Sequence, residues 1–325
     1  MNASTLSASD LKKQLLEHLQ GDLQAVNEVM RRKLETRSSF VSDVTQHVSR
    51  FQGKQIRPML LLLTSRMISG RADRNAAMLA ASVEMIHLAT LVHDDVIDEA
   101  ETRRHVTTVH RRWNTETSVL LGDYLFSKSF HLAASTGDAE ACRLIGLATD
   151  RTCEGELNQS AIRVDGSTTE TDYFRIIRDK TGQLFGLSCL LGARTADGNT
   201  AQQKAARRFG MRLGMAFQIA DDVLDLTQTT AETGKDAGND LQNGRLTLPL
   251  LRACQLASPE TLFRNGANDR ESLCEVEAVQ EGIRSALETA EDLVTKSIRD
   301  LTHFPASADR SFLELIATFA VQRRS

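Results

Sequence analysis

Two clusters of aspartates stand out in the sequence by their spacing. Asp94, Asp95 and Asp98 follow the apolar run MIHLATLV, and Asp98 comes four residues after Asp94. Residues four apart lie on the same face of a helix, so these two side chains would point the same way. Carboxylates 4 Å apart repel each other by about 1 to 4 kcal/mol, depending on the local dielectric. Such a cluster is typical of a site for Mg²⁺, which binds carboxylate oxygens together with substrate phosphates.

The second cluster repeats this spacing, because Asp221, Asp222 and Asp225 close the apolar stretch 207–220. A single DDxxD segment is most often a solvated, charged helix face. Two copies, each following a helix apolar enough to be buried, are not explained in that way. Together they predict several divalent ions and a polyanion bound between two helices.

Cationic side chains occupy positions that suit an anionic ligand. Lys54 and Arg57 lie at the start of an expected helix, where the dipole does not favour cations, so either an anionic partner or ordinary surface charge explains them. His87 lies two turns before Asp94. A lone histidine on an apolar helix is more often a core residue, but here it neighbours the expected anion site. Glu84 could orient His87 or serve only as a charge partner.

Two further segments carry cations. Lys180 and Thr181 lie in the middle of the segment 169–195. They could also be a snorkelling surface lysine and a threonine bonded to the backbone. A glycine-rich polar segment after the second cluster holds Lys235 and Arg245. A mobile, cation-bearing loop beside a metal site would suit a lid over phosphates, and a solvated linker is the alternative.

The composition predicts an all-α protein. The chain has 325 residues, 41% of them hydrophobic, and only four prolines, which are separated by long stretches of helix-forming residues. Alternating β-branched runs are scarce, so we expect no sheet. No linker suggests independent domains, and we expect a single domain over 1–325. Residues 1–40 would contribute an N-terminal helix that packs on the body or on a second subunit.

The net charge and the cysteines of the chain indicate which cellular compartment and which binding partners to expect. The net charge of −4 gives no reason to expect a nucleic-acid partner. Five cysteines without a CxxC pair favour reduced thiols in a cytoplasmic protein. The polar N-terminus lacks a signal peptide, and the longest apolar run, 59–64, is too short for a transmembrane segment. We therefore expect a soluble protein.

Apolar periodicity and turn residues predict where the helices lie. The first helix would bury Leu11, Leu15, Leu19, Val26 and Met30. The expected helices cover 9–35, 58–68, 73–100, 117–135, 138–160, 169–195, 201–226, 246–257, 275–302 and 311–324.

These motifs, taken together, resemble those of the trans-isoprenyl diphosphate synthases, in particular the long-chain polyprenyl type. The similarity runs from about residue 53 to the C-terminal VQRR. It rests on GK-x-x-RP at 53–58, DDxxD-x4-RR at 94–104, GD-[FY]-L at 122–125, KT at 180–181, FQ-x-x-DDxxD at 217–225, GK-x-x-G-x-DL at 234–241 and G-K-x-TLPL at 244–250. The chain departs from the pattern at Arg245, where lysine is usual, and at Asp236, where proline is frequent.

The resemblance implies a bundle of antiparallel helices around a deep central apolar cavity, with the two aspartate motifs facing each other at its mouth. It implies a cluster of about three Mg²⁺. The implied metal ligands are Asp94, Asp98 and Asp221, supported through bound water and neighbouring contacts by Asp95, Asp222 and Asp225. The allylic diphosphate would be bound by Arg103, Lys180, Lys235 and Arg245, with Thr181 and Gln218 near the reacting group. The diphosphate of isopentenyl diphosphate would be bound by Lys54, Arg57, His87 and Arg104.

The implied activity is a prenyl transfer. An allylic diphosphate would ionise with the help of Mg²⁺, condense with isopentenyl diphosphate and lose a proton. The cavity must be apolar and dry, because water would quench the allylic cation. The resemblance also implies a homodimer, and the product would pass to membrane enzymes.

The length of the product would depend on the side chains below the first cluster. Ala89 and Thr90 are both small. In this family bulky aromatic residues at these positions give short products, so the resemblance implies a long polyprenyl chain. Phe126 or Phe130 could form the floor of the cavity.

Other functions remain open at this point. A short-chain farnesyl or geranylgeranyl diphosphate synthase would share the motifs but usually carries an aromatic residue at 89 or 90. A class I terpene cyclase usually lacks the GK-x-x-RP site and has a different second motif. A non-catalytic subunit of a heteromeric synthase usually loses aspartates or basic residues, which this chain keeps. A metal-binding scaffold without catalysis is the simplest alternative.

Overall fold

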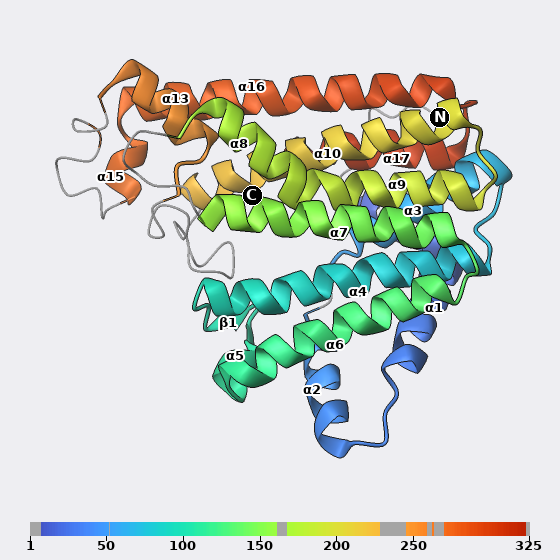
Figure 1. The fold of residues 1–325 in the computed structure, drawn as a ribbon. Helices are drawn as coiled ribbons and strands as arrows, with labels where there is room; N and C mark the ends of the chain where they lie inside the picture. Colours follow the sequence, from blue (N-terminus) through green and yellow to red (C-terminus); the bar gives the residue numbers. More distant parts are fainter. Residues whose placement is uncertain are drawn as a thin grey trace.

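A computed structural model of the protein describes residues 8–51, 53–160, 168–227, 245–258, 262 and 270–322. Within these ranges the chain is almost entirely helical (Figure 1). The long helices are α1 (Ala8–Leu34), α2 (Ser39–Ser49), α3 (Ile56–Ser69), α4 (Arg74–Ile97), α6 (Thr115–Ala134), α7 (Ala139–Ser160), α8 (Glu170–Ile177), α9 (Gln183–Thr195), α10 (Thr200–Thr227), α13 (Leu248–Leu256), α16 (Glu277–Asp300) and α17 (Ala308–Val321). Short helical segments are α5 (Val109–Arg112), α15 (Arg270–Cys274) and a 3₁₀ turn (Leu301–His303).

The all-α prediction is confirmed, and each predicted helix is present with ends within a few residues of those expected. The segment 169–195 is not one uniform helix. It divides into α8, a π-helical segment (Arg178–Gly182) that we call the π-turn, and α9. Helix α2 was not predicted, because its residues, mostly serine, valine, threonine and aspartate, are weak helix formers. Its N-cap residue is Ser38, whose side chain accepts a hydrogen bond from the backbone N of Val41.

The expectation that the chain has no sheet was wrong in one place. Strands β1 (Thr102–Arg103) and β2 (Val106–Thr107) form an antiparallel hairpin. Arg104 and His105 turn between them with φ of 53° and 63°, in the left-handed region. Strands of two residues are too short to produce an alternating pattern, so no pattern in the sequence indicated them.

Helix α4 runs through the bundle and delivers the first aspartate cluster at its end. Its N-cap residue is Asp73, whose carboxylate accepts a hydrogen bond from Ala76 N at 2.7 Å, and Asp98 is its C-cap residue. Among the described helices it alone is long and apolar enough to cross a membrane. However, 78% of its apolar 18-residue stretch is buried inside the protein. Helix α4 therefore packs as a core helix of the bundle.

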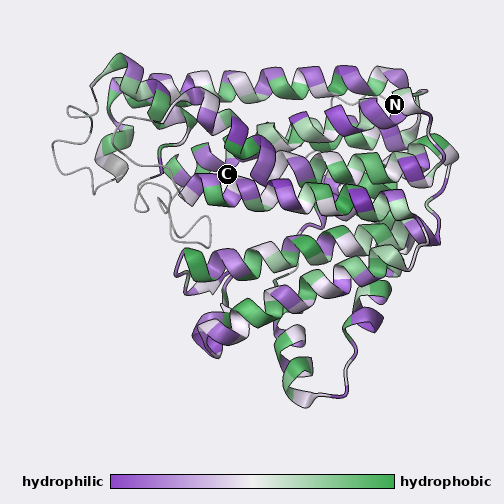
Figure 2. Cartoon of the chain, viewed as in Figure 1, coloured by the Kyte–Doolittle hydropathy of each residue, from purple (hydrophilic) through white to green (hydrophobic). Residues whose placement is uncertain are grey.

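The helices of the bundle form two groups, one packed around α4 and the other around α9 and α10. Helix α4 contacts α6 on one side and α1 and α3 on others, while α9 packs between α3 and α10, and α10 packs on α16. Hydrophobic residues gather where α3, α4 and α9 meet (Figure 2). The predicted stripe of α1 is buried against this body from Leu15 to Met30. The second aspartate cluster lies near the C-terminal end of α10, and Asp221 and Asp225 line the same cavity as Asp94 and Asp98 at the end of α4.

Helices α3 and α9 approach each other more closely than a side chain allows at Gly192. A Cβ atom there would lie 2.3 Å from the backbone oxygen of Leu61 and 2.9 Å from Cβ of Thr64. Gly146, in the middle of α7, has nothing within 4 Å of the corresponding position. The two helical glycines therefore differ in whether close packing requires them.

Replacing Gly192 with Ala is expected to lower the free energy of unfolding by about 1 to 3 kcal/mol, because the backbone of α3 must move away. The matched control Gly146→Ala is expected to raise it by about 1 kcal/mol, since alanine is the better helix former. Urea denaturation followed by circular dichroism measures both. Equal effects of the two substitutions would contradict the packing seen at Gly192.

Candidate active site

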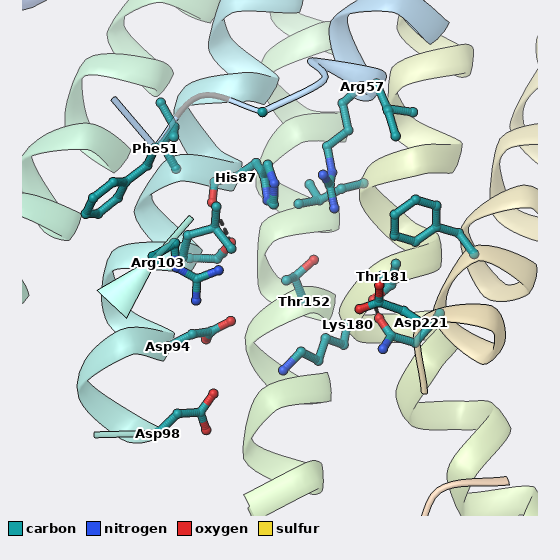
Figure 3. Close-up of a pocket in the computed structure, with 18 of the residues that line it drawn as sticks. Phe51, Arg57, His87, Asp94, Asp98, Arg103, Thr152, Lys180, Thr181 and Asp221 are labelled. Atoms are coloured by element: carbon teal, nitrogen blue, oxygen red, sulfur yellow. Dashed lines mark hydrogen bonds between the residues drawn. The ribbon is translucent and has the colours of Figure 1, made fainter. Parts of the chain in front are cut away.

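A cavity of about 890 Å³ opens where α4, α7 and α10 end near one another. Its wall includes the N-terminal end of α3, the β1–β2 hairpin, the π-turn and the start of α9. Figure 3 shows Asp94 and Asp98 projecting into this space from one side, with Lys180 and Asp221 on the other. The two aspartate clusters, separated by more than a hundred residues in sequence, thus share one cavity.

The first cluster is split between the cavity and the protein interior. Asp94 and Asp98 line the cavity, whereas Asp95 is only 1% exposed. Nε and Nη2 of Arg103 both lie 2.7 Å from Oδ1 of Asp95. Burial raises the pKa of Asp95 to about 6, although the charge of Arg103 opposes the shift. Asp95 therefore holds Arg103 beside the cavity.

The second cluster is split in the same way. Asp221 and Asp225 line the cavity, while Asp222 is buried. The hydroxyl of Tyr173 donates to Asp222 at 2.5 Å, and Nε2 of Gln218 donates to it at 2.8 Å. Each cluster thus presents two carboxylates to the cavity and keeps one within the protein.

The carboxylate oxygens that line the cavity suit a hard divalent cation. Burial raises the pKa of Asp94, and the charge of Asp98 adds to this shift against the opposing charge of Lys180. Among the described residues, no three acidic, histidine or cysteine side chains are close enough to hold an ion by themselves. Mg²⁺ usually keeps several waters and takes one or two carboxylates plus substrate phosphates, so this arrangement fits it.

Cations line the cavity beside the aspartates. Nη2 of Arg245 lies 2.7 Å from Oδ1 of Asp98. Nζ of Lys180 donates to Glu156 at 2.7 Å and to Gln159 at 2.8 Å. The predicted lid residue Lys235 lies outside the described residues.

A second group of cations lines another part of the cavity. It consists of Lys54, Arg57 and Arg104, with His87 beside them. Burial lowers the pKa of Arg57 to about 10, against the charge of Glu84, and the guanidinium lies 4.9 Å from the centre of the Phe185 ring. Nε of Arg57 and Oε2 of Glu84 are buried without a hydrogen-bond partner in the described structure. Such buried polar atoms indicate a place for a polar ligand or water.

Thr181 and Gln218 connect the π-turn to the second cluster. Oγ1 of Thr181 donates to Oε1 of Gln218 at 2.7 Å, and Gln218 in turn donates to Asp222. Both residues line the cavity. This chain of hydrogen bonds fixes the orientation of the Gln218 amide.

The model of the family "Polyprenyl synthetase" matches residues 38–283. The chain belongs to the polyprenyl synthetase family. This confirms the resemblance drawn from the motifs, and with it the assignment as a prenyltransferase with an all-α fold.

Known polyprenyl synthases are similar to this chain over nearly its whole length. It is 33% identical to octaprenyl diphosphate synthase of Haemophilus influenzae over 310 residues, which cover 93% of this chain and 94% of that protein. It is 31% identical to all-trans-nonaprenyl-diphosphate synthase (geranyl-diphosphate specific) of Rhodobacter capsulatus, with 97% and 99% covered. A crystal structure of polyprenyl synthase from Caulobacter crescentus CB15, complexed with calcium and isoprenyl diphosphate, superposes with a TM-score of 0.87 at 32% identity, with 97% and 98% covered.

The residues proposed to set product length are placed differently from one another in this polyprenyl synthetase. Thr90 lines the cavity. Ala89 is fully buried and is not part of the cavity wall. Phe126 and Phe130 are partly buried on α6 and, within the described structure, do not reach the wall either.

Several polar residues of the site were not predicted from the sequence. Glu156 and Gln159 contact Lys180, and Tyr173 contacts Asp222. Their segments read as ordinary amphipathic helices, in which polar residues are expected on the outside. Their roles depend on which helices pack together, and the local pattern does not reveal that.

Replacing Tyr173 with Phe is expected to lower the free energy of unfolding by about 1 to 3 kcal/mol, because the buried carboxylate of Asp222 loses a donor. Tyr124→Phe is the matched control, since Tyr124 is half-buried on α6 and stacks with Lys128 through its ring. Thermal or urea denaturation measures both variants. A Tyr173 variant as stable as the control would contradict the role of this hydrogen bond.

Proposed function

We propose that the protein is a trans-polyprenyl diphosphate synthase that condenses isopentenyl diphosphate with an allylic diphosphate to make a long all-trans chain. The observation that carries the proposal is the joint placement of Asp94, Asp98, Asp221 and Asp225 on one cavity that also holds two groups of cations. Two groups of cations suit two diphosphates, because each diphosphate brings several negative charges. A scaffold that only binds metal would not need the second group.

The residues divide into roles toward the two substrates. Mg²⁺ held by Asp94, Asp98 and Asp221 would supply positive charge against the departing diphosphate of the allylic substrate. Arg103, Lys180, Lys235 and Arg245 would neutralise the same diphosphate. The diphosphate of isopentenyl diphosphate would lie among Lys54, Arg57, His87 and Arg104.

The reaction follows from this arrangement. The allylic C–O bond breaks and its electron pair leaves with the diphosphate. The double bond of isopentenyl diphosphate attacks the allylic carbon, a C–C bond forms, and a proton is lost to the released diphosphate. Leu88, Leu184 and Phe217 on the cavity wall would keep water from the cation. Thr181 and Gln218, which also line the cavity, would lie near the reacting group.

The identity and number of the metal ions belong to the same proposal. Four carboxylates on the cavity wall favour Mg²⁺ and would support a cluster of about three ions bridged by one diphosphate. Asp95, Asp222 and Asp225 would support this cluster through bound water and through the side chains they hold. The calcium named for the Caulobacter crescentus structure is consistent with oxygen ligands for a divalent cation.

A homodimer in the cytoplasm completes the proposal. Val119 and Leu120 of α6 expose apolar side chains on the outer face of the bundle, and we propose that a second copy of the chain covers them. The net charge of −4 and the reduced cysteines agree with a cytoplasmic protein that does not bind nucleic acid. A non-catalytic subunit is disfavoured, because both aspartate clusters and both groups of cations are kept.

Incubation with labelled isopentenyl diphosphate, farnesyl diphosphate and Mg²⁺ is expected to give a labelled prenyl product, and removal of Mg²⁺ by a chelator should abolish it. Asp94→Asn and Asp221→Asn are each expected to lower kcat/KM by about 10²- to 10³-fold, since each removes a charge that positions the cation at the leaving group. Asp292→Asn, on the exposed face of α16, is the control. Full activity of either cavity variant would refute the proposed roles.

A long product is proposed because Thr90, which lines the cavity, and Ala89 beside it are small. Two relatives are named for octaprenyl and nonaprenyl products, and this supports the proposal. Phe126 and Phe130 remain candidates for limiting growth if the chain extends toward α6.

Thr90→Phe is expected to shorten the main product by several isoprene units, because a phenyl ring would fill the path below Asp94. Ala89→Phe is expected to shorten it too, but at a cost in stability of about 1 to 3 kcal/mol, since Ala89 is fully buried. Thr90→Ser is the control that keeps the space open. Mass spectrometry of the dephosphorylated products gives the lengths, and an unchanged length in the Thr90→Phe variant would refute this role.

A further inference from the structure

Helix α7 and the π-turn lie unusually close together at the backbone of Lys180. At Gly155 of α7 a Cβ atom would lie 2.6 Å from the backbone nitrogen of Lys180 and 3.0 Å from the carbonyl carbon of Asp179. A side chain at this position would push the two segments apart. Single π-helical turns within helices often occur at functional sites. Here the π-turn brings the backbone of Lys180 against α7.

Two side chains of α7 hold the ammonium group of Lys180. Nζ donates to Oε2 of Glu156 at 2.7 Å and to Oε1 of Gln159 at 2.8 Å. Thr152, Glu156 and Gln159 have the spacing of one helix face, and all three line the cavity. A lysine stem is long and flexible, so two fixed acceptors restrict the ammonium to one place.

The ammonium is held where it faces the first aspartate cluster. Although burial by itself lowers the pKa of Lys180, the carboxylates of Asp94 and Glu156 raise it above its ordinary value. An ammonium group has three N–H donors, and α7 uses two of them. Within the described part of the chain, the third donor is available for a ligand oxygen that enters the cavity beside Asp94.

We propose that Glu156 and Gln159 are positioning residues that hold the Lys180 ammonium where it meets the leaving diphosphate. This inference rests on the proposed function and assigns to α7 a part in it. What matters is a hydrogen-bond acceptor at each position, and a negative charge at 156 is not required. Neither residue touches the reacting atoms.

The test uses the full-length enzyme with farnesyl diphosphate, isopentenyl diphosphate and Mg²⁺. Glu156→Leu and Gln159→Leu remove the acceptors and are each expected to lower kcat/KM for farnesyl diphosphate by about 10- to 100-fold, mainly through kcat. The KM for isopentenyl diphosphate should stay within about twofold, since Lys180 lies outside that group of cations. Glu156→Gln keeps an acceptor and should restore kcat to within about threefold of wild type.

Glu154→Leu is the matched control, because Glu154 also forms an ion pair on α7, with Arg151 on an exposed face. It is expected to leave both kinetic constants unchanged. A Glu156→Gln variant as impaired as Glu156→Leu would overturn the proposal, because the carboxylate charge itself would then be required. Equal losses of kcat/KM for farnesyl diphosphate and for isopentenyl diphosphate would also overturn it, because they would indicate a general structural role.

A double-mutant cycle separates positioning from direct action. In the Lys180→Met background, Glu156→Leu is expected to have no further effect on single-turnover rates, because the group it positions is gone. An effect as large as in the wild-type background would overturn the proposal. A wild-type enzyme without prenyl transfer would refute the proposed function itself. An active wild type with additive effects would refute only the role of α7.

Discussion

Mutual repulsion between half-buried carboxylates around one cavity is the constraint on which the rest of this structure depends. Asp94 and Asp98 end α4, and Asp221 and Asp225 end α10, so four negative charges face one cavity. Burial raises the pKa of Asp94, and the charge of Asp98 adds to the shift. Helices α4 and α10 both pack on α9, and their acidic ends line the same cavity. Only cations can make that arrangement favourable, and the cavity is lined with them.

The DDxxD spacing directs some carboxylates of each motif into the cavity and one into the protein interior. The first and fifth residues of the motif share one helix face, while the second points about 100° away from the first. Asp95 accordingly turns into the protein to hold Arg103, and Asp222 turns inward to accept from Tyr173 and Gln218. Each motif therefore supplies two carboxylates for a ligand and a third that organises its surroundings. The same short sequence builds a binding site and part of its support.

The sequence predicted those features that depend on local pattern or on motifs. Helix positions followed from apolar periodicity. Both aspartate clusters and Lys54, Arg57, His87 and Lys180 were singled out from residue types and spacing, and Arg103 and Arg104 from the family motifs. All of these except Asp95 and Asp222 line the cavity. The hairpin was missed, because two-residue strands leave no alternation to read. The π-turn was missed, because one extra residue within a helix hardly changes the hydrophobic period. Glu156 and Gln159 were missed, because only the packing of α7 on the π-turn turns them toward Lys180.

The most direct test of this account is a crystal structure of the protein with Mn²⁺ and inorganic diphosphate. Anomalous scattering would locate each ion without reference to activity. The account predicts ions that contact Asp94 and Asp98 on one side and Asp221 on the other, all bridged by a single diphosphate that also meets Lys180. Ions confined to one cluster, or a diphosphate bound away from either, would contradict it.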